Sequence, residues 1–324
     1  MGWPLGVNLR DLFPQHPVPE GWYLGKRIAV DGPNVAFRYL TSFRGRDGDV
    51  LRNRDGRVVA HLIGYLNLVR HLRERGAEPI VVWDGKVHPR KLATVEERIA
   101  RRVEAALNAE EALAAGDQEA HQKFLRATTT LDGKMVEDCS RLLEALGVAV
   151  VRAEHDAERH ATALCHAGFA QAVATEDFDA LVAGAPTVLR KAGSPEPFLH
   201  HLSDLRHHGL TVEQLRAVAI LCGTDWNPGV RGFGAKTAVK MLRDQPDLRV
   251  VLREAEEGLA TTRYHRMIKE AGFTQATFGE LDRFIAELPQ PQAPPRAPKP
   301  DPGMAAAVAE EMGLEASRVL ACFC

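Results

Sequence analysis

Short apolar, β-branched runs alternate with amphipathic stretches along the first two thirds of the chain. The apolar runs lie at residues 28–30, 80–83, 148–151 and 172–175. Between them, residues 61–75 and 135–146 repeat apolar side chains at helical spacing. Strands that alternate with helices form a parallel sheet with helices on both faces, and such sheets bind ligands at the carboxyl ends of their strands. The pattern therefore predicts an α/β fold with its functional site at that edge.

Acidic residues follow each of the four predicted strands. Asp31 follows the first strand and Asp84 the second, and the remaining two are followed by Glu154, Asp156, Glu158, Glu176, Asp177 and Asp179. A single acid after a strand is usually a turn or helix N-cap residue. Four strands that all end in acids would bring many carboxylates to one edge, where cations must neutralise their repulsion. Because Mg²⁺ and Mn²⁺ prefer oxygen ligands, the pattern predicts a site for one or two such ions.

A basic segment begins directly after Asp84. It contains Lys86, Arg90, Lys91, Arg98, Arg101 and Arg102, against only Glu96 and Glu97. Lys91 and Arg98 are seven residues apart, so a helix would place them on nearly the same face. By itself such a segment is equally well a solvated charged face. Beside an acidic cluster, it predicts side chains that steer phosphate groups.

Helical patterns at residues 212–221 and 236–242 flank a glycine-rich turn. Gly232 and Gly234 lie in this turn, and Lys236 lies in the first turn of the following helix. Backbone N–H groups in such a hairpin can hold a phosphate, although an isolated G-x-G is more often a tight turn. The paired helices and the lysine favour a phosphate-binding hairpin.

The composition adds one constraint and removes several classes of protein. Hydrophobic residues make up 45% and charged residues 26% of the 324 positions, as in globular proteins. Lys and Arg number 41 against 43 Asp and Glu; this net charge of −2 argues against a uniformly basic nucleic-acid binder, but not against a protein that segregates its charges. The five cysteines show no CxxC or zinc motif and indicate reduced thiols inside the cell. Neither a membrane span nor a signal peptide is expected.

Several segments, taken in order, resemble the flap endonucleases of the structure-specific 5′-nuclease superfamily. They are IAVDGPNVAF, VVWDGK, VEDCSRLLEALGV, VATEDFDALVAGAP and LCGTDWNPGVRGFGAKTAV, within a match that runs from Met1 to Met241. The resemblance implies a PIN-like α/β nuclease domain with a mostly parallel sheet and helices on both faces. It also implies a helical arch and a C-terminal helix–two-turn–helix DNA-binding element.

The resemblance, together with the proline-rich stretch near the C-terminus, divides the chain into four parts. They are a PIN-like nuclease domain over residues 1–205 with its arch at about 86–134, a helical DNA-binding region over 206–287, a proline-rich connector over 288–303 and a C-terminal helical segment over 304–324. The last segment is expected to form one or two short helices that pack back on the body.

The site residues implied by the resemblance fall on matching positions of this sequence. Its two-metal carboxylates correspond to Asp31, Asp84, Asp156, Glu158, Asp177, Asp179 and Asp225. Lys91 and Arg98 correspond to arch residues that contact the scissile phosphate, and Phe37 to an aromatic that stacks on a base. The remaining expected DNA contacts are Arg44, Arg101, Arg102, Gly232, Gly234 and Lys236. The expected cofactors are two Mg²⁺ ions, for which Mn²⁺ can substitute, and a monovalent cation such as K⁺ at the hairpin.

The resemblance implies metal-dependent cleavage of branched DNA that carries a 5′ flap, with 5′–3′ exonuclease activity, in replication and repair. The expected substrate is 5′-flap or nicked duplex DNA, bound by a monomer inside the cell and away from membranes. The chain departs from the family at Asp156, where a longer Glu is usual, and in its tail, which lacks the family's sliding-clamp motif. The alternatives are a non-catalytic branched-DNA-binding protein, a bubble-cutting nuclease and an RNA-directed PIN nuclease. The short interval between Asp84 and Met135 favours a compact arch over the long insertion of bubble cutters.

Overall fold

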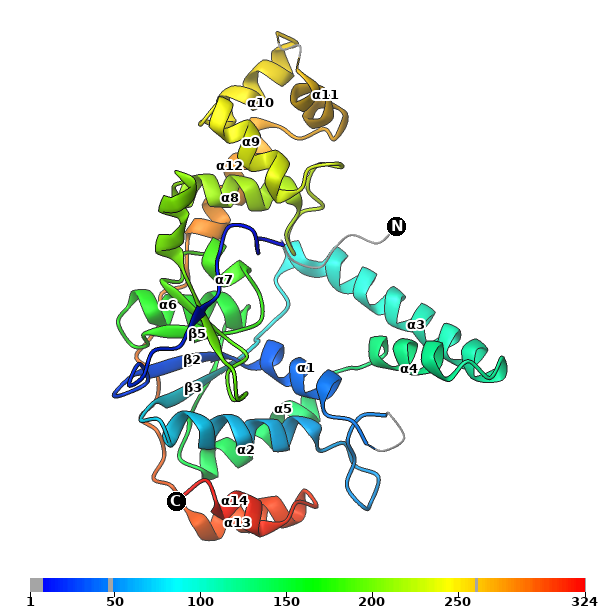
Figure 1. Ribbon diagram of the computed structural model, residues 1–324, viewed down its shortest axis with the longest axis vertical. Helices are drawn as coiled ribbons and strands as arrows, with labels where there is room; N and C mark the ends of the chain where they lie inside the picture. The colour runs from blue at the N-terminus through cyan, green and yellow to red at the C-terminus, as the bar shows by residue number, and fades with distance from the viewer. Residues whose placement is uncertain (1–7, 46–48, 260–261, 324) are drawn as a thin grey trace.

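A mostly parallel sheet forms the centre of the molecule (Figure 1). The computed structural model describes residues 8–45, 49–259 and 262–323, and within them seven strands pair in the order β1-β7-β6-β5-β2-β3-β4. They are β1 (His16–Pro17), β2 (Arg27–Asp31), β3 (Glu78–Trp83), β4 (Ala149–Arg152), β5 (Ala172–Ala174), β6 (Thr187–Arg190) and β7 (Phe198–His201). The run from β6 to β4 is parallel, whereas β7 and β1 add antiparallel pairs at one edge. The predicted α/β sheet is confirmed, and β2, β3, β4 and β5 form where the apolar runs predict them.

Some of the helices cover both faces of this sheet, and the others form the arch and the region after residue 205 (Figure 1). In the first part of the chain the helices are α1 (Gly32–Ser42), α2 (Ala60–Arg73), α3 (Leu92–Ala114), α4 (Gln118–Ala127), α5 (Gly133–Ala145), α6 (Ala157–His166) and α7 (Asp179–Val182). In the rest they are α8 (Val212–Cys222), α9 (Ala235–Asp244), α10 (Leu248–Glu257), α11 (Arg263–Glu270), α12 (Gln275–Ala286), α13 (Pro302–Glu311) and α14 (Ala316–Leu320). 3₁₀ segments occur at Pro89–Lys91 and Leu202–His208.

The alternation of side chains along the central strands divides the core into two halves. Ile28 and Val30 of β2 enter a cluster with α1, α2, α5 and α13, whereas Ala29 between them enters a cluster with α6, α7 and α8. Neighbouring strand residues point to opposite faces, so a continuous apolar run is what a strand buried on both faces requires. The second cluster continues through α9, α10 and α12, so the helices after residue 205 share a core with the sheet domain.

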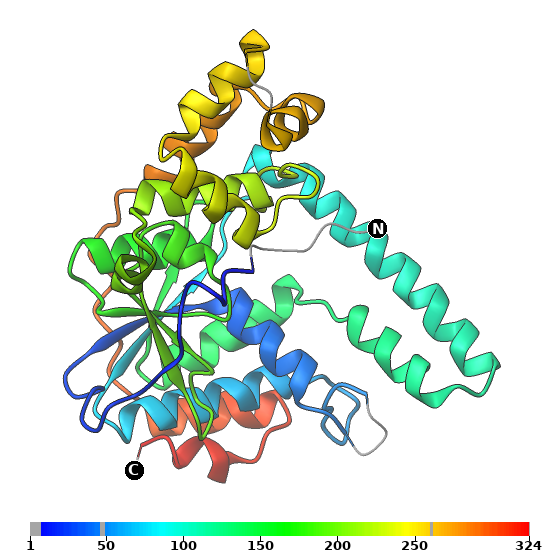
Figure 2. The ribbon, with the colours of Figure 1, turned by 45° about the horizontal axis from the view of Figure 1, so that its top comes forward.

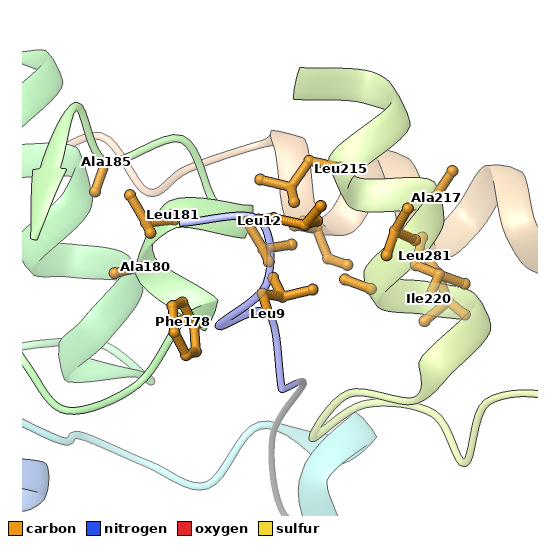
Figure 3. Close-up of a cluster of buried hydrophobic side chains, with 14 of the residues drawn as sticks. Leu9, Leu12, Phe178, Ala180, Leu181, Ala185, Leu215, Ala217, Ile220 and Leu281 are labelled. Atoms are coloured by element: carbon orange, nitrogen blue, oxygen red, sulfur yellow. The ribbon is translucent and has the colours of Figure 1, made fainter. Parts of the chain in front are cut away.

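The N-terminal segment helps to join the two regions. Leu9 and Leu12 are buried between Phe178 and Leu181 on one side and α8, with Leu215, on the other (Figure 3). Phe13 stacks on Phe178 with ring centroids 6.0 Å apart. This packing orients the C-terminal helices relative to the strand ends, where the acidic residues lie.

Helices α3 and α4 form a hairpin that projects from the body as an arch (Figure 2). Ala105, Ala109 and Ala112 of α3 are buried at its contact with α4, and the His121 ring lies 2.8 Å from the Ala109 carbonyl oxygen. Small alanines let the two helices approach closely without a large apolar core. The alanine- and glutamate-rich composition of this region, which predicts helix, is explained by this packing.

The proline-rich connector forms no helix or strand between residues 288 and 301 and leads back to the face of the sheet that α2 and α5 cover. Asp301 donates its N–H to the Ala145 carbonyl oxygen at 3.0 Å, and α13 then packs on α5. The Arg141 guanidinium meets the Glu311 carboxylate at 2.6 Å. The two short helices expected to pack on the body are therefore α13 and α14.

The structure describes four of the five cysteines and most, but not all, of the segment that resembles the flap endonucleases. Cys139, Cys165, Cys222 and Cys322 form no disulfide, whereas Cys324 and the start of the family resemblance at Met1 and Gly2 lie outside the described residues. Among the described helices, none has the length and apolar character that crossing a membrane requires.

Candidate active site: an acidic cavity at the base of the arch

A cavity of about 550 Å³ opens between the carboxyl edge of the sheet and the base of the arch. Its acidic lining residues are Asp31, Asp84, Asp156, Glu158, Asp177 and Asp225. Asp179 does not line the cavity; it is buried at the start of α7, where its charge acts on Glu158. The structure therefore brings six of the seven predicted carboxylates together in one cavity. Five of them end or follow strands of the sheet, and the sixth, Asp225, lies in the loop after α8.

Local geometry fixes Asp31 and Asp84 at their strand ends. Asp31 ends β2 and caps α1, accepting hydrogen bonds from the Asn34 N–H at 3.3 Å and the Thr175 hydroxyl at 3.1 Å. Asp84 follows β3 and accepts from the Ala157 N–H at 2.8 Å. The chain after Asp84 lies close to the backbone that leads into α6, and this requires a glycine at position 85. A Cβ on Gly85 would lie 2.1 Å from the Ala153 carbonyl oxygen.

Asn34 and Thr175 are site residues that the sequence analysis missed. The Asn34 side chain donates to Asp177 at 3.4 Å and accepts from the Glu176 N–H at 2.8 Å, so it links the ends of β2 and β5. Their signal was positional, since each lies within three residues of an acid that follows a strand. Glu176 and Glu154 stay outside the cavity: the Glu176 carboxylate pairs with Arg38 at 2.8 Å, and the Glu154 side chain is exposed.

The carboxylates strongly perturb one another. Burial, and then the charge of Asp84, raises the pKa of Asp31 to about 7. Burial and the charges of Asp179 and Asp177 raise the pKa of Glu158 well above its ordinary value, and burial with the charge of Asp225 raises that of Asp177. A group of acids held this close stays ionised only when positive charge is brought to it.

Lys91 and Arg98 supply positive charge from the base of the arch. Lys91 Nζ lies 2.5 Å from Asp156 and 3.7 Å from Asp225, and the Arg98 guanidinium meets both Asp225 oxygens at 2.8 Å. Burial alone would lower the pKa of Lys91, but the Asp156 and Asp225 carboxylates outweigh it and hold the pKa above its ordinary value. The two residues expected to face phosphate thus contact acids in this state of the protein.

The donor set fits hard divalent cations. No three His, Cys, Asp or Glu side chains among the described residues form a group that could hold a metal ion as they stand. Within the same residues, however, Asp156 Oδ2 and Glu158 Oε1 are buried without a hydrogen-bond partner. Buried carboxylate oxygens of this kind are costly unless a ligand satisfies them, and an all-oxygen set suits Mg²⁺ or Mn²⁺.

The residues expected to contact DNA fall into three places. Phe37, Arg101 and Arg102 line the same cavity as the acids. Arg44 lies outside the cavity lining, donates to the Thr41 carbonyl oxygen at 3.0 Å, and has its pKa lowered by burial and by Arg126 of α4.

The glycine hairpin lies apart from the cavity, between α8 and α9. Gly232 has φ +87°, a conformation that favours glycine, and Gly234 is the N-cap of α9. The exposed Lys236 side chain meets Asp11 of the N-terminal segment at 3.2 Å. None of these three residues lines the acidic cavity.

Known proteins share both the sequence and the fold. Residues 16–105 match the XPG N-terminal domain and residues 147–225 match the XPG I-region. Flap endonuclease 1 of Aeropyrum pernix is 35% identical over 285 residues, which cover 82% of this chain and 81% of that protein. Flap endonuclease 1 of Methanothermobacter thermautotrophicus is 35% identical over 258 residues, or 78% of each chain.

Among solved structures, flap endonuclease-1 from Methanococcus jannaschii superposes with a TM-score of 0.73 at 29% identity and covers 98% of this chain and 97% of its own. The catalytic core of Rad2 in complex with a DNA substrate has the same fold, with a TM-score of 0.71 at 16% identity. The identity to the curated relatives extends over most of both chains and includes both matched regions. The chain therefore belongs to the flap endonuclease family.

Proposed function

We propose that the protein is a structure-specific 5′-flap endonuclease that hydrolyses phosphodiester bonds in branched DNA during replication and repair. The observation that carries this proposal is the single cavity in which carboxylates from separate strands meet Lys91, Arg98 and Phe37. Family membership supports it, because relatives that share about a third of the sequence are flap endonucleases by name. A 5′–3′ exonuclease activity on nicked duplex is part of the same proposal.

Catalysis is proposed to depend on two Mg²⁺ ions, with Mn²⁺ as a substitute. The residues that would hold them are Asp31, Asp84, Asp156, Glu158, Asp177, Asp179 and Asp225. When bound, such ions lower the pKa of a water molecule and stabilise the leaving oxygen. The shorter Asp156 is included because its Oδ2 is buried without a hydrogen-bond partner. A monovalent cation such as K⁺ is proposed at the hairpin around Gly232.

Lys91 and Arg98 are proposed to exchange their acidic partners for the scissile phosphate. Their ion pairs with Asp156 and Asp225 place both cations beside the acids before DNA arrives. Once other cations neutralise the acids, the two side chains become available to offset charge that develops on the phosphate. Phe37 on the cavity wall would stack on an unpaired base, an interaction that tolerates any sequence.

The rest of the chain is proposed to select the shape of the DNA. Residues 1–205 would form the nuclease domain with its arch at about 86–134, where Arg44, Arg101 and Arg102 meet the strand that passes beneath. Residues 206–287 would hold duplex through the N–H groups near Gly232 and Gly234 and through Lys236. The connector over 288–303 would return the chain to the segment over 304–324, which packs on the nuclease domain. The protein is proposed to act as a monomer inside the cell, and any sliding-clamp contact would use a surface other than a tail motif.

A cleavage assay with three substrates tests the function. A 5′-flap DNA, a nicked duplex and a bubble are incubated with Mg²⁺ or with EDTA, beside Asp177→Asn and the exposed control Asp55→Asn. We expect Mg²⁺-dependent cleavage of the flap, weaker cleavage of the nick, loss of activity in Asp177→Asn and full activity in Asp55→Asn. Absence of any product would leave a branched-DNA-binding protein as the conclusion, and preference for the bubble would indicate the bubble-cutting class.

A further inference from the structure

Aromatic side chains from two distant parts of the chain meet beside Lys91. The Lys91 Nζ atom lies 5.1 Å from the centre of the Trp226 ring, and Trp226 meets Phe284 of α12 edge to face with centroids 5.4 Å apart. Arg159 of α6 has its guanidinium 4.0 Å from the centre of the Phe284 ring and 5.9 Å from that of Trp226. We call the pair Trp226 and Phe284 the aromatic platform.

The platform also contacts the segment that leads into the arch. The His88 ring centroid lies 4.7 Å from that of Phe284, and the Arg90 guanidinium lies 5.7 Å from the same ring. The Arg159 guanidinium donates to the carbonyl oxygens of Phe284 and Glu287, which fixes the end of α12 to α6. The base of the arch, the start of α6 and the end of α12 therefore meet at one partly buried aromatic contact.

An aromatic ring attracts a cation without carrying a net charge, whereas a carboxylate neutralises the cation that it binds. The carboxylates of Asp156 and Asp225 neutralise Lys91, and they are the groups proposed to bind other cations. The Trp226 ring attracts the ammonium through its quadrupole and leaves the full positive charge available to a phosphate. Trp226 is only 9% exposed and the Lys91 side chain 18%, so this attraction acts in a partly dehydrated site, where it is strongest.

We propose that Trp226 and Phe284 are positioning residues that hold Lys91 at the mouth of the acidic cavity while its acidic partners are engaged elsewhere. This inference rests on the proposed function, because it assigns Lys91 to the scissile phosphate. Trp226 acts directly on the ammonium. Phe284 acts through Trp226 and through His88 and Arg90, so its loss has the smaller effect. Neither aromatic residue is assigned a contact with DNA.

Single-turnover cleavage of a 5′-flap DNA tests the proposal in two backgrounds, the natural chain and Lys91→Met. In the natural chain we expect Trp226→Leu to slow cleavage by about 3- to 30-fold and Phe284→Leu by about 2- to 5-fold, with unchanged affinity for the flap. Trp226→Phe, which keeps an aromatic ring beside Lys91, should retain most of the cleavage rate that Trp226→Leu loses. In Lys91→Met neither aromatic substitution causes a further loss, because the residue through which it acts is gone.

Phe278→Leu is the matched control. Phe278 lies in the same helix α12 and has the Arg249 guanidinium 5.7 Å from its ring centre, the same separation as between Arg90 and Phe284. It makes no ring contact with the platform, so its replacement leaves the cleavage rate unchanged. A loss as large as that of Phe284→Leu, or equal losses in the two Lys91 backgrounds, would overturn the proposal and indicate a general structural role.

Amine acylation followed by peptide mass spectrometry supplies a readout that does not depend on cleavage. With Mg²⁺ present and no DNA, so that the acidic partners are engaged, Trp226→Leu and Phe284→Leu should raise the labelling of Lys91 and leave that of Lys236 unchanged. Unchanged Lys91 labelling would contradict positioning even if the protein cleaves flaps. Raised Lys91 labelling in a protein without nuclease activity would instead retain the positioning and refute the function. If Trp226→Leu does not fold, Phe284→Leu and Trp226→Phe carry the same comparison.

Discussion

At the scale of single residues, the ion pairs of Lys91 and Arg98 show how closely the basic and acidic side chains of the site are packed. Asp156 and Asp225 hold the two cations within the cavity, so the base of the arch lies close to the acids. The acidic and basic side chains of the site therefore lie in the same cavity, with their opposite charges paired. The side chains proposed to hold metal and those proposed to meet phosphate thus neutralise one another's charge within the cavity.

Replacement of Lys91 should separate catalysis from binding. We expect Lys91→Met to slow single-turnover flap cleavage by about 100-fold or more, because one cation that offsets the developing phosphate charge is lost. The dissociation constant for the flap, measured without cleavage by fluorescence anisotropy, should change by less than about threefold, since many other contacts hold the duplex. Lys86→Met, in the same segment but outside the cavity lining, is the control. Equal losses of rate and affinity would make Lys91 an ordinary phosphate anchor.

The raised pKa of Asp31 predicts how the metal-free protein responds to pH. A carboxyl whose pKa is higher in the folded than in the unfolded state favours folding while it is protonated, and that contribution is lost as the pH rises through the folded value of about 7. We therefore expect thermal unfolding in EDTA to show stability that decreases from about pH 4, near the ordinary pKa of 3.8, to about pH 7, by up to about 1.4 kcal/mol per pH unit for each such proton.

Two changes should flatten this pH dependence. Asp31→Asn removes the titrating group, and Mg²⁺ supplies the positive charge that ionised carboxylates need. A matched substitution at the exposed Asp55 should leave the slope unchanged. If Asp31→Asn retained the full slope in EDTA, the destabilisation would have to come from another group, such as Glu158, whose pKa burial also raises.

At the scale of elements, the C-terminal helices complete the core on one face of the sheet. Met312, at the end of α13, is fully buried in the cluster with α2 and α5, whereas Met304 at the start of the same helix is 56% exposed. We expect Met312→Ala to lower the free energy of unfolding by about 2–5 kcal/mol and Met304→Ala to change it by less than about 0.5 kcal/mol. Chemical denaturation measures both. Equal effects would mean that α13 is only loosely attached.

The strands and acids were predictable from sequence because each depends on local order along the chain. The apolar runs of β2, β3, β4 and β5 are short but continuous, contain β-branched residues, and each ends beside an acid. By contrast, β1 has two residues and β7 reads Phe-Leu-His-His, so neither carries a strand signal of its own. Both lie at the antiparallel edge and are fixed by pairing with strands that fold elsewhere.

The unpredicted part of the site depends on contacts between distant segments. The basic segment after Asp84 signalled phosphate steering, but not the pairing of Lys91 with Asp156 or of Arg98 with Asp225. Trp226 lies in the turn after α8 and Phe284 in α12, and neither aromatic by itself signals a role at the site. Phe284 reaches the arch base because α12 packs against α8 and its end is held by Arg159 of α6. The sequence thus indicated which residues could take part in the site, whereas the tertiary structure decides which of them pair with one another.

At the scale of the whole molecule, a net charge of −2 conceals two opposed regions. Six of the acids line one cavity, while Lys91, Arg98, Arg101 and Arg102 line its arch side and Lys236 lies at the hairpin. Two divalent ions in the cavity would raise the formal charge from −2 to about +2. The affinity for DNA should therefore increase when divalent ions are added, and fluorescence anisotropy measures this change.

Lys236 offers the clearest test of how this charge meets duplex DNA. Its side chain is 84% exposed and its ion pair with Asp11 lies at the surface, where such a pair contributes little to stability, so a phosphate can replace Asp11 at small cost. Each phosphate contact made by a Lys releases about one counterion. We expect Lys236→Ala to weaken flap binding for every sequence alike and to reduce the slope of log affinity against log salt by about 1. Lys299→Ala, in the exposed connector, should leave the slope unchanged. Anisotropy titrations over a range of salt concentrations measure both, and an unchanged slope in Lys236→Ala would remove the hairpin from the DNA interface.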